Sequence, residues 1–266
     1  MSDKGTYRHL LIERRGSVVR VSLNRPEVRN AFNAELIEDL QRCFSALSLD
    51  EQVRAIVLLG AGPLFSAGAD LNWMRASLEY TREENIADAL HMSDMFTAID
   101  NCSKPVIGRI HGAALGGGVG LVCVCDRVIA AEGTRFGLTE VNLGIAPAVI
   151  SPFVLRCIGQ GHARSLGMTG EFFDAARAHE IGLVHRVVPP EQLDAAVDET
   201  LKHLLSSGPM GVKVTKELFR AVPGLSYEAA RQLTAEAIAA LRVSKEGQEG
   251  IRAFLEKRRA SWGEEG

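Results

Sequence analysis

The sequence predicts an α/β fold, in which helices cover a layered β-sheet, followed by a helical C-terminal region. Two observations indicate this. Over residues 1–190, short apolar runs typical of buried strands alternate with segments whose apolar residues repeat at helical spacing. After residue 190 the strands stop, and segments 191–206, 209–221, 227–243 and 246–260 all have helical patterns. We therefore predict a core over residues 1–190 and a helical region over residues 191–266.

The N-terminal segment predicts a β-hairpin and a helix. Residues 10–14 and 18–23 are rich in β-formers and are separated by Arg15-Gly16-Ser17, which suits a hairpin turn. Asn24-Arg25-Pro26 ends the second strand. A helix is expected after Asn33, because asparagine is a good N-cap and the apolar residues that follow have helical spacing. These residues are Leu36, Ile37, Leu40, Cys43, Phe44 and Leu47.

Three further strands are expected in the core. Residues 55–59 form a short, unbroken apolar run of the kind that is buried on both faces of a sheet. Residues 105–110 and 128–131 have the same character, and a glycine-rich helix start at Gly116 lies between them. Strands that alternate with helices in this way favour a layered sheet.

The composition disfavours several classes of function. The 266 residues are 46% hydrophobic and carry a formal net charge of −3, which gives no electrostatic reason to bind nucleic acid or an anionic membrane. There is no apolar run of about 18 residues, and the first residues, Met1–Lys4, lack a signal-peptide pattern. The five cysteines are scattered, and no His/Cys/Asp cluster has metal-site spacing. We expect a cytoplasmic protein with reduced thiols and no metal.

Two glycine-rich turns are candidates for chemistry. They are Phe65–Leu71, after the strand that ends near Gly60, and His111–Gly118, between a strand and a helix. Glycine lets a backbone approach a ligand closely, and a helix N-terminus offers unpaired N–H donors. Two such donors aimed at one oxygen form an oxyanion hole. The alternative is that these glycines only permit tight packing of turn on strand.

The two turns belong to a set of short motifs with a specific order and spacing. These motifs are Leu23–Pro26, Asn30–Asn33, Phe65–Leu71, Lys104–Ile107, Gly112–Gly118, Cys125–Asp126, Phe136–Gly137, Glu140, Leu143–Gly144 and Phe254–Arg258. Through them the chain resembles the enoyl-CoA hydratase/isomerase (crotonase) superfamily over almost its full length. The resemblance implies a ClpP-like spiral of repeated ββα units and a C-terminal helical region that forms trimers. It also implies an acyl-CoA substrate, no separate cofactor, and a homotrimer or a homohexamer.

The resemblance also assigns residues to the site. The backbone N–H groups of Ala69 and Gly117 are expected to hold the thioester oxygen. The core would bind the CoA, and the helical region would close the CoA site of a neighbouring subunit through Phe254 and Lys257. The alternative for Lys257, and for Arg29, is a solvated surface. The residues expected to line the CoA path within the core are Val28, Arg29, Ala31, Ala67, Asp70 and Leu71.

The acid–base residues depart from the hydratase pattern. Hydratases of this superfamily use two glutamates; the second matches Glu140, whereas the first is replaced by Gly120, which we expect to leave room in the site. One glutamate is the pattern of Δ3,Δ2-enoyl-CoA isomerases, and Ala148 disfavours a dienoyl-CoA isomerase. His91 or Asp94 could replace the missing carboxylate, although a solvated helix face is the simpler interpretation of both.

Three segments resemble the bacterial methylglutaconyl-CoA hydratases of leucine catabolism. They are residues 118–122, 146–153 and 244–250. The resemblance predicts a lyase that interconverts 3-methylglutaconyl-CoA, or a close branched enoyl-CoA, and 3-hydroxy-3-methylglutaryl-CoA. The main alternative is a Δ3,Δ2-enoyl-CoA isomerase that uses Glu140 alone. An RNA-binding function is disfavoured by the acidic balance and the absence of a Lys/Arg run.

Overall fold

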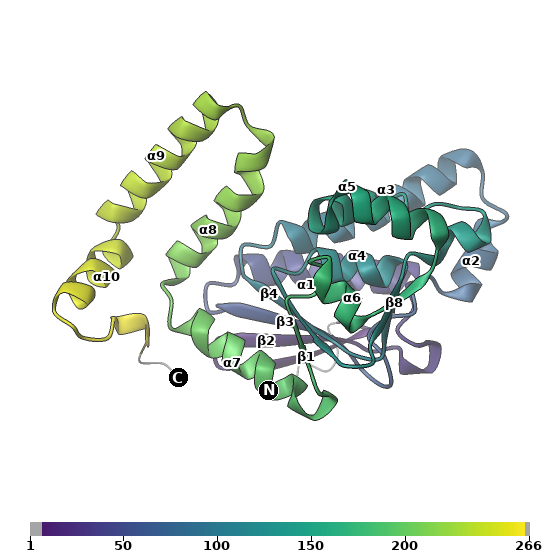
Figure 1. The fold of residues 1–266 in the computed structure, drawn as a ribbon, viewed down its shortest axis with the longest axis horizontal. Coiled ribbons are helices and arrows are strands. Elements are labelled where there is room, and N and C mark those ends of the chain that lie inside the picture. Colours follow the sequence, from purple (N-terminus) through teal and green to yellow (C-terminus); the bar gives the residue numbers. More distant parts are fainter. Residues whose placement is uncertain (1–6, 264–266) are drawn as a thin grey trace.

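The core is built on a six-stranded sheet (Figure 1). The computed structural model describes residues 7–263, so the segment Met1–Lys4 lies outside the described residues. The strand order is β1-β2-β3-β4-β6-β9; β1 and β2 form the predicted antiparallel hairpin, and the other pairs are parallel. The strands are β1 (Leu10–Arg15), β2 (Val18–Leu23), β3 (Ala55–Gly60), β4 (Val106–Ile110), β6 (Arg127–Ala131) and β9 (Arg186–Val188).

The core also contains a second sheet, which has three strands in the order β5-β7-β8. It consists of β5 (Ala113–Leu115), β7 (Arg135–Gly137) and β8 (Phe172–Asp174). β5 and β7 are parallel, whereas β7 and β8 are antiparallel. These strands were not predicted from the sequence, because three residues are too few to show a period of two.

Helices cover both faces of the large sheet, which explains its unbroken apolar strands. Alternate residues of a strand point to opposite faces, so Ile56 and Leu58 of β3 join one buried cluster, whereas Ala55 and Val57 join another. The first cluster includes α1 (Ala34–Leu49), α3 (Arg82–Asp100), α4 (Gly117–Cys123) and α5 (Ser151–Thr169). The second includes α7 (Leu193–Leu205), on the other side of the sheet (Figure 1).

The helix predicted after Asn33 is present with its expected cap. The Asn33 side chain accepts a hydrogen bond from the Leu36 N–H, and α1 runs from Ala34 to Leu49. Two short helices, α2 (Leu71–Ser77) and α6 (Ala175–Glu180), complete the core. Of these, α2 matters for the site, because it begins directly after the first glycine-rich turn.

The last three helices project from the core (Figure 1). They are α8 (Pro209–Ala221), α9 (Tyr227–Val243) and α10 (Lys245–Leu255). Arg54, directly before β3, holds their base by donating hydrogen bonds to the carbonyl oxygens of Leu205, Ser207 and Trp262. Lys216 of α8 adds a contact to the core, a 2.7 Å ion pair with Asp126. The helical region is therefore attached at the amino end of β3.

The final helix is shorter than predicted. A helix was expected over residues 246–260, but α10 ends at Leu255. Lys257 has a left-handed backbone conformation, with φ of 54°, and the Arg258 N–H donates to the Ala253 carbonyl across the helix end. This pairing is the Schellman motif, which terminates helices. It usually places glycine at the left-handed position, so the lysine at this position gave no sequence signal for it.

Candidate active site

The two glycine-rich turns pack directly on each other. The Ser66 N–H donates to the Ala113 carbonyl at 3.1 Å, and the Leu115 N–H donates back to the Ser66 carbonyl at 3.0 Å. Between them, Gly68 has φ of +87°, and a Cβ placed on it would lie 2.9 Å from the Leu115 carbonyl oxygen. Only glycine fits this approach without strain. The first turn is thereby fixed against Gly116, directly before α4.

The backbone around Ala69 orients its N–H away from the protein core. The Phe32 N–H donates to the Gly68 carbonyl at 2.7 Å, and the Asp70 N–H donates to the Phe32 carbonyl at 2.9 Å. Successive N–H groups of an extended chain point to opposite sides, so the Ala69 N–H points away from Phe32. Within residues 7–263, no protein oxygen accepts a hydrogen bond from the N–H of Ala69 or of Gly117.

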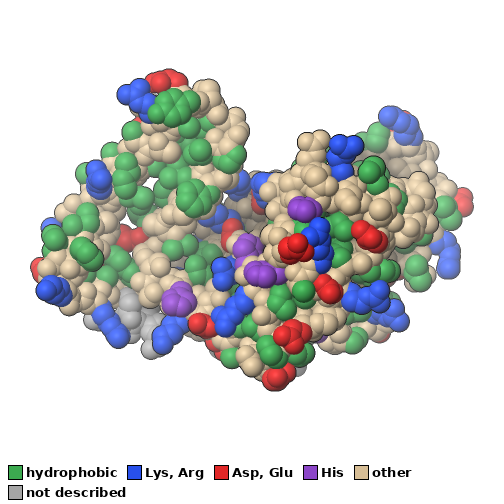
Figure 2. Space-filling view, in the orientation of Figure 1, with side chains coloured by type: hydrophobic (Ala, Val, Ile, Leu, Met, Phe, Trp, Pro, Cys, Tyr) green, Lys and Arg blue, Asp and Glu red, His purple; other side chains and the backbone are tan. Residues whose placement is uncertain are grey.

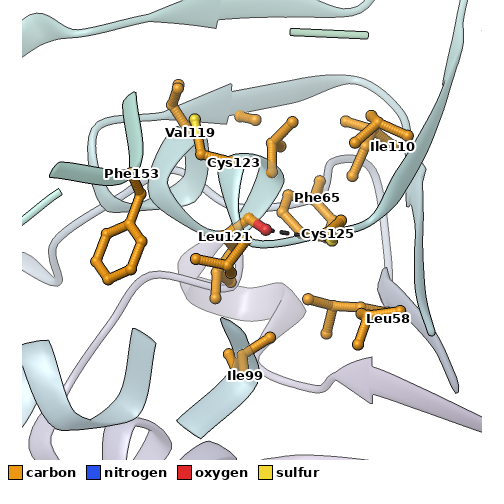
Figure 3. Packing of buried hydrophobic residues seen from close by; sticks show 14 of the residues in the cluster. Leu58, Phe65, Ile99, Ile110, Val119, Leu121, Cys123, Cys125 and Phe153 are labelled. Carbon is orange, nitrogen blue, oxygen red and sulfur yellow. Dashed lines mark hydrogen bonds between the residues drawn. The ribbon is translucent and has the colours of Figure 1, made fainter. Parts of the chain in front are cut away.

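Helix α4 presents its first N–H groups from a rigid position. All seven of its residues are buried. Figure 3 shows Val119, Leu121 and Cys123 of this helix among core side chains that include Ile99 of α3 and Phe153 of α5. The N-terminus of a helix carries partial positive charge and unpaired N–H donors. Close packing on all sides therefore holds these donors in one place.

The first residue of α4 has no space for a side chain. A Cβ placed on Gly117 would lie 2.6 Å from a ring carbon of Phe32 and 3.3 Å from the Cε methyl of Met92. The preceding residue, Gly116, donates its N–H to the Gly137 carbonyl of β7 at 2.9 Å. This bond connects the start of α4 to β7, the strand that precedes Glu140 in the chain.

Glu140 directs a buried carboxyl group at the start of α4. It lies in a short 3-10 helix, Thr139–Leu143, two residues after the end of β7. A Cβ on Gly116 would lie 3.1 Å from its Oε1. Its Oε2 is buried and has no hydrogen-bond partner among the described residues. Burial raises the pKa of Glu140 above its ordinary value, because a low-polarity environment disfavours the charged form.

The space expected at Gly120 is filled. A Cβ on Gly120 would lie 2.4 Å from Cγ2 of Ile150 and 2.9 Å from ring carbons of Phe96. The expectation that Gly120 leaves room in the site is therefore wrong: apolar side chains fill the space that the first glutamate of the hydratase pattern would take. Ile150 belongs to the unusual segment 146–153, so two departures from the hydratase pattern that lie 30 residues apart in sequence are in contact.

The residues predicted to line the CoA path within the core come together around one ion pair. Arg25 and Asp70 are both buried and form a 2.8 Å ion pair. Burial opposes ionisation of Asp70, but the Asn72 N–H and the Arg25 guanidinium lower its pKa below its ordinary value. Asp70 is thus a structural partner of Arg25. Hydrogen bonds connect other members of this set. The Ala67 N–H donates to the Arg29 carbonyl, and Arg25 donates to the Ala31 carbonyl. Val28 and Leu71 are next to these residues in sequence, and the Arg29 side chain is exposed.

Phe254 and Lys257 are not part of this group within one chain. Ala69 and Gly117 lie after the carboxyl ends of β3 and β4, whereas the helical region is attached at the amino end of β3 through Arg54. Phe254, on α10, is 82% exposed. In the extended arrangement of Figure 1, α10 lies apart from α2 and α5.

The two proposed substitutes for the missing glutamate do not face α4. His91 lines a cavity beside α1 together with Tyr7, Glu38 and Arg42. Asp94 is exposed. Asp88 lies on the same helix and is half-buried, and it was not among the residues predicted from the sequence. Asp88 precedes Met92, Met95 and Ile99 by four, seven and eleven residues, and this helical spacing could have predicted that it shares their face of the helix.

Two open backbone donors beside a buried carboxyl group define a class of site. Such a site stabilises negative charge on a carbonyl oxygen while a proton moves at a neighbouring carbon. Within the described residues, no helix is long and apolar enough to cross a membrane, and no group of three or more His, Cys, Asp or Glu residues is arranged to hold a metal.

Comparison with known proteins identifies the family. The family model "Enoyl-CoA hydratase/isomerase" matches residues 13–265, and the chain belongs to this family. It is 32% identical to the crotonyl-CoA hydratase of Syntrophomonas wolfei, covering 96% of this chain and 98% of that protein. It is also 32% identical to the short-chain-enoyl-CoA hydratase of Clostridium acetobutylicum, covering 94% and 96%. The crystal structure of an enoyl-CoA hydratase from Shewanella pealeana has 39% identity and a TM-score of 0.92, covering 97% of each chain. The predicted crotonase fold is confirmed.

Proposed function

We propose that this member of the family is a hydratase that adds water reversibly across the double bond of a short, branched enoyl-CoA. The observation that carries the proposal is the carboxyl group of Glu140, which lies against Gly116 with its Oε2 buried and unpartnered among the described residues, in a site with the free N–H groups of Ala69 and Gly117. The S. wolfei and C. acetobutylicum relatives, both named as hydratases of short enoyl-CoA, support hydration as the reaction.

The chemistry follows from the two parts of the site. The N–H groups of Ala69 and Gly117 hold the thioester oxygen and stabilise the enolate that forms when charge moves onto it. In the dehydration direction, Glu140 removes the proton from carbon 2, and the hydroxyl group leaves carbon 3 as water after receiving a proton. Hydration is the reverse of these steps. The raised pKa of Glu140 favours the protonated form more than in an ordinary glutamate, which suits a group that both accepts and donates a proton.

The proposed acyl group is 3-methylglutaconyl, with 3-hydroxy-3-methylglutaryl-CoA as the hydrated product. The support is the resemblance of residues 118–122, 146–153 and 244–250 to methylglutaconyl-CoA hydratases, together with the contact between Gly120 and Ile150, which joins two of these segments. The reaction requires no cofactor beyond the CoA thioester, which is the substrate.

The test is incubation with crotonyl-CoA and 3-methylglutaconyl-CoA in water enriched in heavy oxygen, followed by mass spectrometry. We expect solvent oxygen on carbon 3 of the product from both substrates and a higher kcat/KM for the branched one. A higher kcat/KM for crotonyl-CoA contradicts the acyl assignment alone. Absence of solvent oxygen from both products contradicts hydration.

One observation favours a second candidate, a Δ3,Δ2-enoyl-CoA isomerase. The position of the first hydratase glutamate is occupied by Ile150 and Phe96, which leaves Glu140 as the carboxyl group held against α4. One carboxyl group is sufficient to move a single proton between carbons 2 and 4. Conversion of a 3-enoyl-CoA without incorporation of solvent oxygen distinguishes this activity from hydration.

The proposed active form is a homotrimer or a dimer of trimers. The projecting helices expose large apolar side chains, including Phe219 at 77% and Val243 at 80%, and Figure 2 shows hydrophobic side chains along this region. Exposed apolar surface of this extent is typical of a protein interface. Assembly would bring Phe254 and Lys257 of one subunit to the CoA of the next, where the lysine ammonium would pair with a phosphate.

A further inference from the structure

Helix α3 carries a half-buried carboxylate, Asp88, in line with its buried residues. Asp88 lies four, seven and eleven residues before Met92, Met95 and Ile99, so all four share a face of the helix. Met95 and Ile99 are fully buried, and Met92 packs against the core. An aspartate is unusual in such a series, because burying a charge is costly unless it is paired or used. The position of Asp88 therefore suggests that its carboxylate has a functional role.

The contacts between α3 and α4 locate Asp88 relative to the site. Phe96 of α3 packs on Gly120 of α4, whereas Met92, one turn earlier in α3, packs on Gly117 at the start of α4. The two helices thus run in the same direction. Asp88 lies one further turn toward the N-terminus of α3, about 6 Å beyond Met92 at 1.5 Å per residue. This step carries it past the first residue of α4, to the side toward which the N-terminal N–H groups of α4 point.

The surroundings of Asp88 keep its carboxyl group available. Burial raises its pKa above its ordinary value, whereas the nearby Trp73 indole and His91 act in the opposite direction. The Trp73 Nε1–H is buried and has no well-formed hydrogen bond within residues 7–263. No arginine or lysine among the described residues forms an ion pair with Asp88. A half-buried carboxylate with one neighbouring donor can still accept a proton.

We propose that Asp88 is the second carboxyl group of the active site and accepts the proton of the water molecule that attacks carbon 3. The inference rests on the proposed hydratase function and deepens it. It explains how hydration proceeds although the usual position of the first glutamate is filled by Ile150 and Phe96. Glu140, which lies against Gly116 directly before α4, then serves carbon 2.

The proposed step balances in protons and electrons. The water oxygen forms a bond to carbon 3 while one of its protons passes to the Asp88 carboxylate. The π electrons of the double bond move toward the thioester oxygen and give the enolate. Protonated Glu140 then donates its proton to carbon 2, and the thioester carbonyl reforms. The cycle closes when Asp88 releases its proton to solvent and Glu140 takes one up.

The test separates the two carboxyl groups by two reactions. Hydration of crotonyl-CoA requires attack by water at carbon 3, whereas exchange of the carbon 2 protons of butyryl-CoA in deuterium oxide requires only the oxyanion donors and Glu140. We expect Asp88→Asn to lower the hydration rate by about 10²-fold or more and to change the exchange rate by less than about 3-fold. Asp94→Asn, which changes an exposed carboxylate on the same helix, is the matched control and should leave both rates unchanged.

The outcomes are distinguishable. Equal losses of hydration and exchange in Asp88→Asn indicate a structural role and overturn the inference, as does full retention of hydration. If the wild-type protein exchanges the carbon 2 protons but does not hydrate any enoyl-CoA tested, the proposed hydratase function is wrong and the inference falls with it. That result is visible without any variant.

Discussion

The side chain of Glu140 is the residue whose removal should affect the reaction most. Glu140→Gln is nearly isosteric but cannot accept a proton, so we expect a loss of about 10²–10⁴ in kcat. CoA binding should persist, because the proposed CoA contacts lie elsewhere. Steady-state kinetics and calorimetric titration with a CoA thioester measure the two effects. A variant that keeps more than about a tenth of the wild-type rate assigns the proton transfer to another residue.

The burial of the same carboxyl group predicts a pH dependence of stability. Its pKa in the folded protein is raised above the ordinary value of 4.5. At pH values between the pKa of Glu140 in the unfolded chain and its raised pKa in the folded protein, the folded state binds more protons than the unfolded state. The contribution of Glu140 to the free energy of unfolding therefore falls as pH rises through this range. Glu140→Gln does not titrate. The stability of this variant relative to wild type should therefore increase as pH rises from about 4.5 and level off above the raised pKa.

Urea unfolding of both proteins at a series of pH values measures this difference. Glu35→Gln is an unsuitable control, because His9 holds the pKa of Glu35 below its ordinary value. An exposed glutamate such as Glu171, to which no ion pair is formed in the described structure, serves better. A stability difference between Glu140→Gln and wild type that is the same at every pH would show that the carboxyl group is not perturbed.

Restoring a glutamate at position 120 should destabilise the protein. A Cβ at this position already lies 2.4 Å from Ile150, and overpacking a core typically costs about 1–3 kcal/mol. A carboxylate buried among Ile150 and Phe96 adds a desolvation cost. We expect Gly120→Glu to lower Tm by several degrees, about 2–4 °C per kcal/mol for a domain of this size, and to slow the reaction. Unchanged Tm with faster turnover contradicts this.

At the scale of elements, the N-terminus of α4 supplies one of the two proposed oxyanion donors. Gly117→Pro removes that N–H and should cost about 10²–10³ in rate. Any side chain at this position also meets the Phe32 ring at 2.6 Å, so the proper reference is Gly117→Ala, which keeps the N–H and adds the same clash. Turnover numbers and circular dichroism of the two variants give the comparison. Equal rates in the two variants remove Gly117 from the oxyanion hole.

Elements with strong local signals were predictable from sequence. The hairpin of β1 and β2, the Asn33 cap of α1 and the apolar runs of β3, β4 and β6 were all predicted close to their observed bounds. Helix α5 was not predicted, and its sequence contains Gly159 with φ of 71°, which interrupts the helical backbone. The strands β5, β7 and β8 depend on pairing between distant segments, and such pairing leaves little local pattern.

The site was predictable in part, for a related reason. The glycine-rich turns are visible in sequence because close backbone contact requires glycine, and the structure packs them together as their composition suggested. That the space at Gly120 is filled could not be predicted from the sequence. It depends on Ile150 at the N-terminus of α5, which only the folded chain brings next to Gly120. Asp88 could have been found by extending the apolar series of α3 toward its N-terminus.

At the scale of the whole molecule, we predict that the protein sediments as a trimer or a hexamer at micromolar concentration. The physical reason is the apolar surface of α8 to α10, which a monomer would leave in water. Analytical ultracentrifugation, with activity measured over the same concentration range, is the test. A fully active monomer contradicts both the assembly and the role of Phe254 and Lys257 in a neighbouring subunit.

The contact between Gly120 and Ile150 also couples the substitutions that each of the two positions can accept. A chain that acquires glutamate at position 120 while isoleucine remains at position 150 is overpacked. A chain that first loses isoleucine has an apolar cavity, at a cost of about 2–5 kcal/mol for truncation to alanine. Most proteins have a stability margin of only about 5–15 kcal/mol. Either single step uses part of that margin, so a glutamate at position 120 is expected to be tolerated best together with a smaller residue at position 150 and a stabilising change elsewhere.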